Sequence, residues 1–114
     1  MFISFEAIFY ENDVPKEKDT LVIYDKEWQE EAQRILKEKY PSIEYDREVY
    51  REITGNVLSV EEIDEVVFVG NKGTIVNNIS KLRRMAKETS LIIVSEDISS
   101  NLKQVLDGFS RVVS

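Results

Sequence analysis

The sequence predicts a single α/β domain over residues 1–114, a three-layer Rossmann-like sandwich whose mostly parallel sheet of four to six strands carries helices on both faces. Short apolar runs alternate along the chain with segments of helical periodicity, which is the pattern of βαβ units. The runs are apolar throughout and rich in β-branched residues, as in strands that are buried on both faces. Right-handed crossovers between such strands would place helices on the faces of the sheet.

The N-terminal half predicts two strands and a helix. Residues 2–10 alternate between apolar and polar side chains, which predicts a strand that is either antiparallel or at the edge of the sheet. A polar connection follows at 12–19, and the apolar residues 20–24 predict a buried strand. Apolar residues at helical spacing predict a helix at 26–39, which Pro41 ends.

The stretch from residue 42 to residue 65 is the least regular part of the chain. Alternation predicts a strand at 43–47, and helical spacing after it predicts a short helix as far as Thr54. Gly55–Asn56 predicts a turn, and Ser59 with Glu62 could form a capping box.

The C-terminal half predicts two further buried strands, at 66–69 and 91–94. A helix is predicted between them at 75–88. Ser99 or Ser100 caps a last helix that ends at Gly108. Residues 111–113 predict a final short strand.

Composition excludes several classes of function. The chain has no cysteine and no histidine, which removes disulfides, cysteine nucleophiles and mechanisms built on a histidine base. An enzyme is therefore disfavoured. No apolar run approaches the roughly 20 residues that span a bilayer, and the first residues lack the basic region of a signal peptide. The expectation is a cytoplasmic protein that makes no membrane contact, and the abundant Lys and Glu suit a thermophile.

Ligands of such a sheet bind beyond the carboxyl ends of the strands, which singles out the loops 25–27, 70–74 and 95–100. The loop 70–74 is the leading candidate for an anion site, because its glycines let the backbone approach a ligand and the next helix begins there. The plain alternative is a tight turn before a solvated helix. The candidate residues are Gly70, Asn71, Lys72, Gly73 and Thr74.

Charge is distributed unevenly. The net charge is −7, but residues 72–87 contain five basic and no acidic residues. Binding of RNA through this run is one hypothesis, since phosphate contacts come from clustered Lys and Arg. A solvated helix face is the alternative. The candidate residues on the predicted helix are Lys81, Arg83, Arg84 and Lys87.

Two segments of this half resemble the L7Ae/L30e family of RNA-binding proteins. They are Lys72-Gly73-Thr74 at a helix start and the apolar strand 91–95, which is followed by Glu96-Asp97. In that family the glycine-opened helix contacts a kink-turn RNA, so the resemblance implies RNA binding. Ile75 and Val76 stand where the family carries Asn-Glu.

Acidic residues near predicted strand ends suggest a metal hypothesis. Asp25, Asp46, Glu96 and Asp97 could hold magnesium through oxygen ligands if they converge. Such a site would support phosphoryl or phosphodiester chemistry. The alternative is that these acids cap the helices that follow them.

The sequence thus supports three hypotheses in order. The first is a non-enzymatic binding module for a phosphorylated small ligand or a protein partner, with RNA binding and a magnesium-dependent enzyme as alternatives. No cofactor is identified. A homodimer is also predicted, with Phe2, Phe9 and Tyr10 on an edge strand as the residues most exposed to a second copy.

Overall fold

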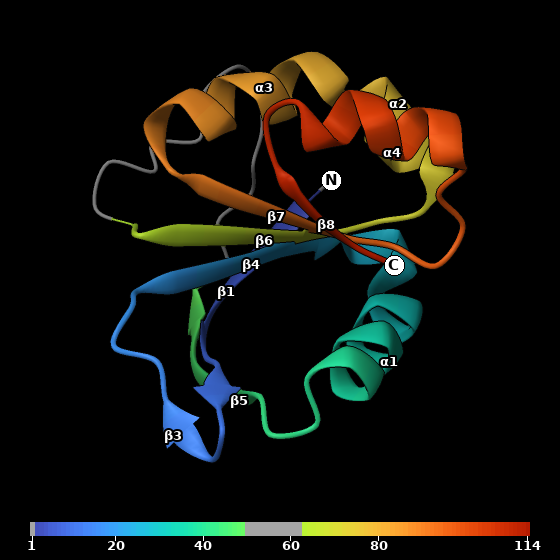
Figure 1. The fold of residues 1–114 in the computed structure, drawn as a ribbon. Helices are drawn as coiled ribbons and strands as arrows, with labels where there is room; N and C mark the ends of the chain where they lie inside the picture. The colour runs from blue at the N-terminus through green and yellow to red at the C-terminus, as the bar shows by residue number, and fades with distance from the viewer. Residues whose placement is uncertain (1, 50–62) are drawn as a thin grey trace.

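One mixed sheet organises the computed structural model, which describes residues 2–49 and 63–114 (Figure 1). Its six strands lie in the order β5-β1-β4-β6-β7-β8. Strands β4, β6, β7 and β8 run parallel to one another, whereas β1 is antiparallel to both of its neighbours, β4 and β5. The sheet is therefore mostly parallel. The strands are β1 (Phe2–Ile8), β4 (Thr20–Asp25), β5 (Glu44–Val49), β6 (Glu65–Val69), β7 (Ser90–Val94) and β8 (Arg111–Val113).

Four α-helices in the described residues pack on this sheet, α1 on one face and α2, α3 and α4 on the other (Figure 1). A 3-10 turn, η1 (Lys26–Trp28), leads into α1. The helices are α1 (Gln29–Lys39), α2 (Lys72–Asn77), α3 (Ile79–Glu88) and α4 (Ser100–Asp107). No helix within 2–49 and 63–114 has both the length and the apolar character that a bilayer crossing needs.

Alternate residues of each central strand enter two cores. Val22 and Tyr24 of β4 pack with Ile35 and Leu36 of α1, whereas the intervening Ile23 faces the helices of the opposite side. Every residue of β6 is buried. The apolar strands are thus buried on both faces, as their composition predicted.

The helix predicted at 75–88 begins earlier and is interrupted. Asn71 caps its first part, and Asn78 separates α2 from α3 with φ −118° and ψ 14°. The Asn78 Nδ2 donates a hydrogen bond to the Thr74 carbonyl oxygen at 2.7 Å. An asparagine that bonds nearby backbone competes with the helix, which accounts for the break.

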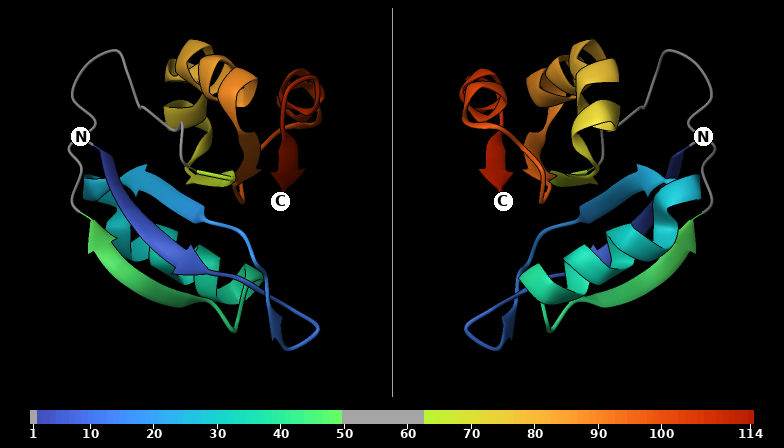
Figure 2. Two further views of the ribbon diagram at one scale, coloured as in Figure 1. Left: turned by 90° about the vertical axis from the view of Figure 1, so that its left-hand side faces the viewer. Right: turned by 90° about the vertical axis from the view of Figure 1, so that its right-hand side faces the viewer.

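A small hairpin replaces the predicted polar connection at 12–19. Strands β2 (Tyr10–Glu11) and β3 (Val14–Pro15) form a separate two-stranded sheet that projects beyond the large one (Figure 2). Its turn residues Asn12 and Asp13 have φ values of 52° and 62°. Two left-handed residues are what a two-residue hairpin turn requires, and Asn and Asp tolerate that conformation.

Two sequence predictions in the N-terminal half need correction. The strand at residues 2–10 is antiparallel but lies inside the sheet, because β1 pairs on both sides. Phe9 is buried against Tyr40 with 4.8 Å between ring centroids, so the edge that was to meet a second copy does not exist at β1. The homodimer itself stays a prediction.

The second correction concerns residues 43–54. Strand β5 runs to Val49, so the residues where the predicted helix was to begin are extended. The rest of that helix, the turn at Gly55–Asn56 and the capping box of Ser59 and Glu62 lie outside the described residues.

The direction of the crossovers reverses between β4 and β6. The chain leaves β4 through α1 and reaches β5 at one edge of the sheet. It leaves β6 through α2 and α3, which pack on the opposite face, and reaches β7 in the direction of the other edge. This reversal is the topological switch point, outside which open α/β sheets bind ligands. The predicted loops after β4, β6 and β7 therefore follow the carboxyl ends of adjacent parallel strands.

Candidate functional site

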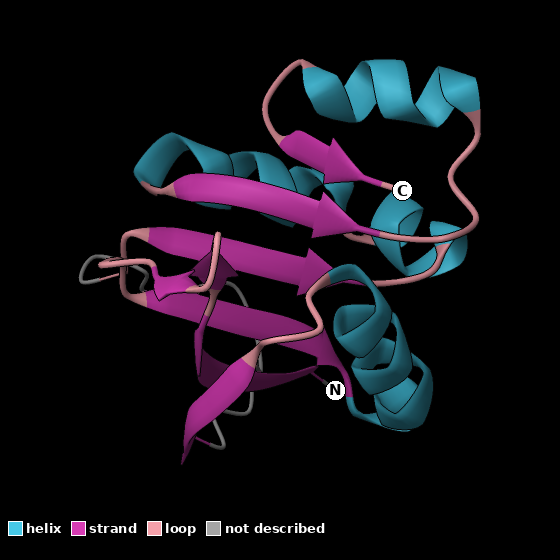
Figure 3. Cartoon of the chain, turned by 60° about the horizontal axis from the view of Figure 1, so that its bottom comes forward, coloured by secondary structure: helices cyan, strands magenta, loops and turns pink. Residues whose placement is uncertain are grey.

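The carboxyl ends of β4, β6 and β7 point to the same edge of the sheet, which we call the rim (Figure 3). The rim consists of the loops 25–27, 70–74 and 95–100. Backbone contacts join the second and third of these loops, since the Gly70 N–H donates to the Val94 carbonyl oxygen at 3.1 Å. The sequence prediction that these loops meet at one edge is thus confirmed by the strand directions.

Asp97 joins the two loops through its side chain. Its Oδ1 accepts a hydrogen bond from the Lys72 backbone N–H at 2.8 Å and another from the Ser95 hydroxyl at 2.9 Å. Ser95 is fully buried at the end of β7. A carboxylate at the start of a helix is favourably placed against the helix dipole. Asp97 therefore acts as an internal anion at the start of α2.

The predicted anion loop is largely closed by the protein's own acceptors. Besides Lys72, whose N–H is bonded to Asp97, Thr74 donates its N–H to the Asn71 Oδ1 at 2.9 Å. The prediction for 70–74 relied on free N–H groups, and these two amides have acceptors within the chain. The anion site stays a prediction.

The two glycines of this loop differ in how much space a side chain would have. A Cβ on Gly70 would lie 3.1 Å from the Phe68 ring, which is tighter than an ordinary contact, so a side chain there would require the ring to shift. A Cβ on Gly73 would meet only the Asn71 Oδ1, at the ordinary distance of 3.5 Å. Packing therefore explains Gly70 and leaves Gly73 without a structural requirement.

Glu96 is bound by Arg34, a residue that no sequence pattern predicts to lie at the rim. Two hydrogen bonds of 3.0 Å each join the guanidinium of Arg34 in α1 to the Glu96 carboxylate. Arg34 also pairs with Glu31 at 2.8 Å and with Glu38 at 3.0 Å. Hydrogen bonding to Arg34 lowers the pKa of Glu96, and the same carboxylates raise the pKa of Arg34. The pair links α1 to the loop after β7 across 62 residues of sequence.

The carboxylates of the metal hypothesis do not gather in the structure. Asp25 accepts a hydrogen bond from the Glu27 N–H at 3.0 Å and so caps η1. Glu96 forms an ion pair with Arg34, and Asp97 accepts a hydrogen bond from the first backbone N–H of α2. Asp46 lies in β5 beside the pairs Tyr45–Ala7 and Arg47–Glu6, far along the strand from the rim. In the described part of the chain no three metal-ligating side chains come together. The capping alternative fits Asp25, which caps the turn that follows it, but not Asp97, because Ser99 caps the helix after Asp97.

The basic residues of α3 form an exposed surface that has no ion pairs with the residues the structure describes. Lys81, Arg83, Arg84 and Lys87 are exposed, while Leu82 between them is fully buried. None of these cations forms an ion pair with a residue that the structure describes. Arg83 lies 5.5 Å above the centre of the Phe109 ring, which fixes its guanidinium beside α4. We call these four residues the α3 basic face.

Comparisons of the chain with protein-family models, with curated proteins and with solved structures found no match. The resemblance to the L7Ae/L30e family therefore depends on the residues quoted above.

Proposed function

We propose that this chain is a non-enzymatic, Rossmann-like binding module that docks an acidic protein partner on the α3 basic face. The observation that carries the proposal is a contrast between two surfaces. At the rim, Asp25, Glu96 and Asp97 are each bonded within the chain. On α3, exposed cations lack such partners among the described residues. Cations that have no acidic partner within the chain can attract an acidic protein and orient it on this helix.

The arrangement of helices supports the Rossmann-like part of the proposal. The buried residues of α1 and those of α2, α3 and α4 belong to separate cores on opposite sides of the sheet. A three-layer sandwich with its switch point between β4 and β6 accounts for this arrangement.

The distribution of charge favours a compact acidic patch on a protein over a long nucleic acid. The whole chain carries −7, although residues 72–87 carry five basic and no acidic residues. The remainder is therefore strongly acidic, and an RNA that extends beyond α3 would meet it. An acidic protein patch of limited size would contact the α3 basic face alone, with attraction over about one Debye length of 10 Å at moderate salt.

A matched pair of charge reversals tests the proposal. Arg84→Glu reverses a charge on the α3 basic face, and Lys26→Glu makes the same change in net charge in an exposed residue of the rim. Fluorescence anisotropy with a labelled oligoglutamate peptide at low and physiological salt measures binding. We expect Arg84→Glu to weaken binding at least about fivefold, as for the loss of one favourable charge contact, and Lys26→Glu to change it little.

Three outcomes would overturn the proposed docking surface. They are no binding of the peptide at low salt, equal loss in both variants, and a labelled RNA hairpin that binds more tightly than the peptide through the same residues. The last outcome would assign the α3 basic face to RNA instead.

A phosphorylated small ligand at the switch point is the second candidate function. It is favoured by Gly73, which the fold does not require to be glycine. A thermal-shift screen with inorganic phosphate and ATP tests it, using Gly73→Ala as the variant. Stabilisation by either compound that Gly73→Ala abolishes would support the ligand, and the absence of any shift in the unaltered protein would remove it.

A further inference from the structure

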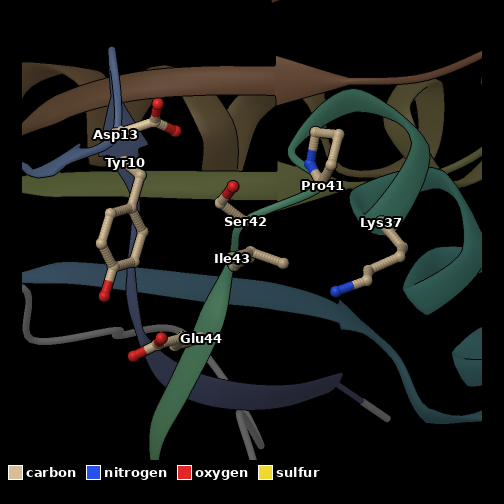
Figure 4. A pocket seen from close by; sticks show the side chains of 7 residues that line it. All are labelled: Tyr10, Asp13, Lys37, Pro41, Ser42, Ile43 and Glu44. Atoms are coloured by element: carbon tan, nitrogen blue, oxygen red, sulfur yellow. The ribbon is translucent and has the colours of Figure 1, made fainter.

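A hollow of about 420 Å³ lies between the β2–β3 hairpin and the turn that joins α1 to β5 (Figure 4). Tyr10 and Asp13 line it from the hairpin, Lys37 from α1, and Ser42 and Glu44 from the turn and β5. Its volume is near the lower end of the range for small-molecule sites. The hollow is remote from the α3 basic face, which lies on the opposite side of the sheet.

Opposite charges line this hollow without pairing with one another. The Lys37 ammonium is on one side, and the Asp13 and Glu44 carboxylates are on the other (Figure 4). Lys37 has no carboxylate oxygen within 4.0 Å among the described residues. A molecule that carries both charges could therefore contact the lysine and the carboxylates at the same time.

Uncharged groups complete the lining. The Tyr10 hydroxyl faces Glu44, and a hydrogen bond to that carboxylate raises the pKa of Tyr10, so the phenol keeps its proton at neutral pH (Figure 4). Ser42 adds a second hydroxyl near the middle of the hollow. Ile43 also borders the hollow, but it is only 7% exposed and belongs to the core beneath.

We propose that this hollow binds a small zwitterion, with its carboxylate at Lys37 and its ammonium at Glu44, while Asp13 adds negative charge on the same side. The chemical class is an amino acid, whose two charged groups match the two sides of the hollow. The inference is independent of the docking function of α3, because it uses other residues on another part of the molecule.

A series of amino acids with increasing separation between ammonium and carboxylate tests the site. Glycine, β-alanine, γ-aminobutyrate and ε-aminohexanoate are titrated into isotope-labelled protein, and amide chemical shifts are followed by NMR. Ethylamine and propionate, which carry one charge each, are the controls for either charge alone. We expect saturable shifts at residues 10–13 and 41–44, with the tightest binding at one separation.

Two lysine variants make the result specific. Lys37→Met should raise the dissociation constant of the best zwitterion about two- to fivefold, the effect of one exposed charge contact. Lys26→Met removes the same charge elsewhere and should leave it unchanged. The amide spectrum of each variant establishes that it is folded. Shifts that do not saturate, equal binding of the singly charged controls, or an unchanged constant in Lys37→Met would each overturn the site.

Discussion

Asp97 is the residue on which the rim depends most. One of its oxygens accepts hydrogen bonds from the backbone of α2 and from the buried Ser95 at the end of β7. A carboxylate that accepts hydrogen bonds in this way holds two loops in a fixed relation. At the rim, the Asp97 carboxylate thus occupies the position next to the start of α2 where an external anion would otherwise bind.

Replacement of Asp97 should lower stability. Asp97→Ala removes the hydrogen bonds from the Lys72 N–H and the Ser95 hydroxyl, at a cost of about 1 kcal/mol in the free energy of unfolding. Urea denaturation of the variant and of Asp107→Ala, an exposed acid at the end of α4, measures the effect. Equal midpoints for the two variants would show that Asp97 does not hold the rim.

The two glycines of the loop should respond to alanine in opposite directions. Gly73→Ala should raise the free energy of unfolding by about 0.5 kcal/mol, because alanine favours the helix and its Cβ would make only an ordinary contact, with the Asn71 Oδ1 at 3.5 Å. Gly70→Ala should lower it, because its Cβ would crowd the Phe68 ring at 3.1 Å. Urea denaturation measures the free energy of unfolding of both variants. Destabilisation by Gly73→Ala would contradict the space that surrounds Gly73 at the start of α2.

At the scale of elements, Arg34 and Glu96 connect α1 to the loop that precedes α4. The pKa of Glu96 is lower in the folded chain than in the unfolded one because Arg34 binds its charged form. Such a pair stabilises the fold above the unfolded pKa of about 4.3, and this contribution is lost as the pH falls through the lowered folded value.

A glutamine variant isolates this contribution. The melting temperature of the unaltered protein should exceed that of Glu96→Gln at neutral pH, and the difference should shrink as the pH falls toward about 3. High salt should reduce the difference as well, because both side chains are exposed. A difference that is independent of pH would contradict the assigned pair.

The elements differ in how far their residues predict them. Strands β4, β6 and β7 follow from their uniformly apolar residues, and α1 follows from its apolar periodicity. The β2–β3 hairpin was missed because its Asn12–Asp13 turn lacks the glycine that usually marks such turns. Strand β5 was placed correctly at its start but cut short, because its polar residues resemble an exposed helix as much as an edge strand.

Only the position of the candidate site, and not its side-chain contacts, could be predicted from the sequence. The three loops of the rim follow from the order and direction of the strands, which local patterns reveal. The hydrogen bond from Lys72 to Asp97 spans 25 residues and that from Arg34 to Glu96 spans 62. Contacts of this length depend on how elements pack, so periodicity in the sequence does not indicate them.

At the scale of the whole molecule, positive charge is concentrated on one helix of an otherwise acidic chain. At the rim, Asp25, Glu96 and Asp97 are hydrogen-bonded within the chain, whereas the α3 basic face leaves four cations without described acidic partners. This contrast in charge pairing is the reason why we propose recognition on the outer surface of α3 ahead of ligand binding at the rim.

An NMR titration of isotope-labelled protein with oligoglutamate peptide at low salt tests this central claim most directly. The account predicts that the largest amide shifts occur between Lys81 and Lys87 and that they vanish as salt is raised, while residues 70–74 and 95–97 are little affected. Shifts concentrated in those two loops, or no shifts on α3 at any peptide concentration, would contradict it.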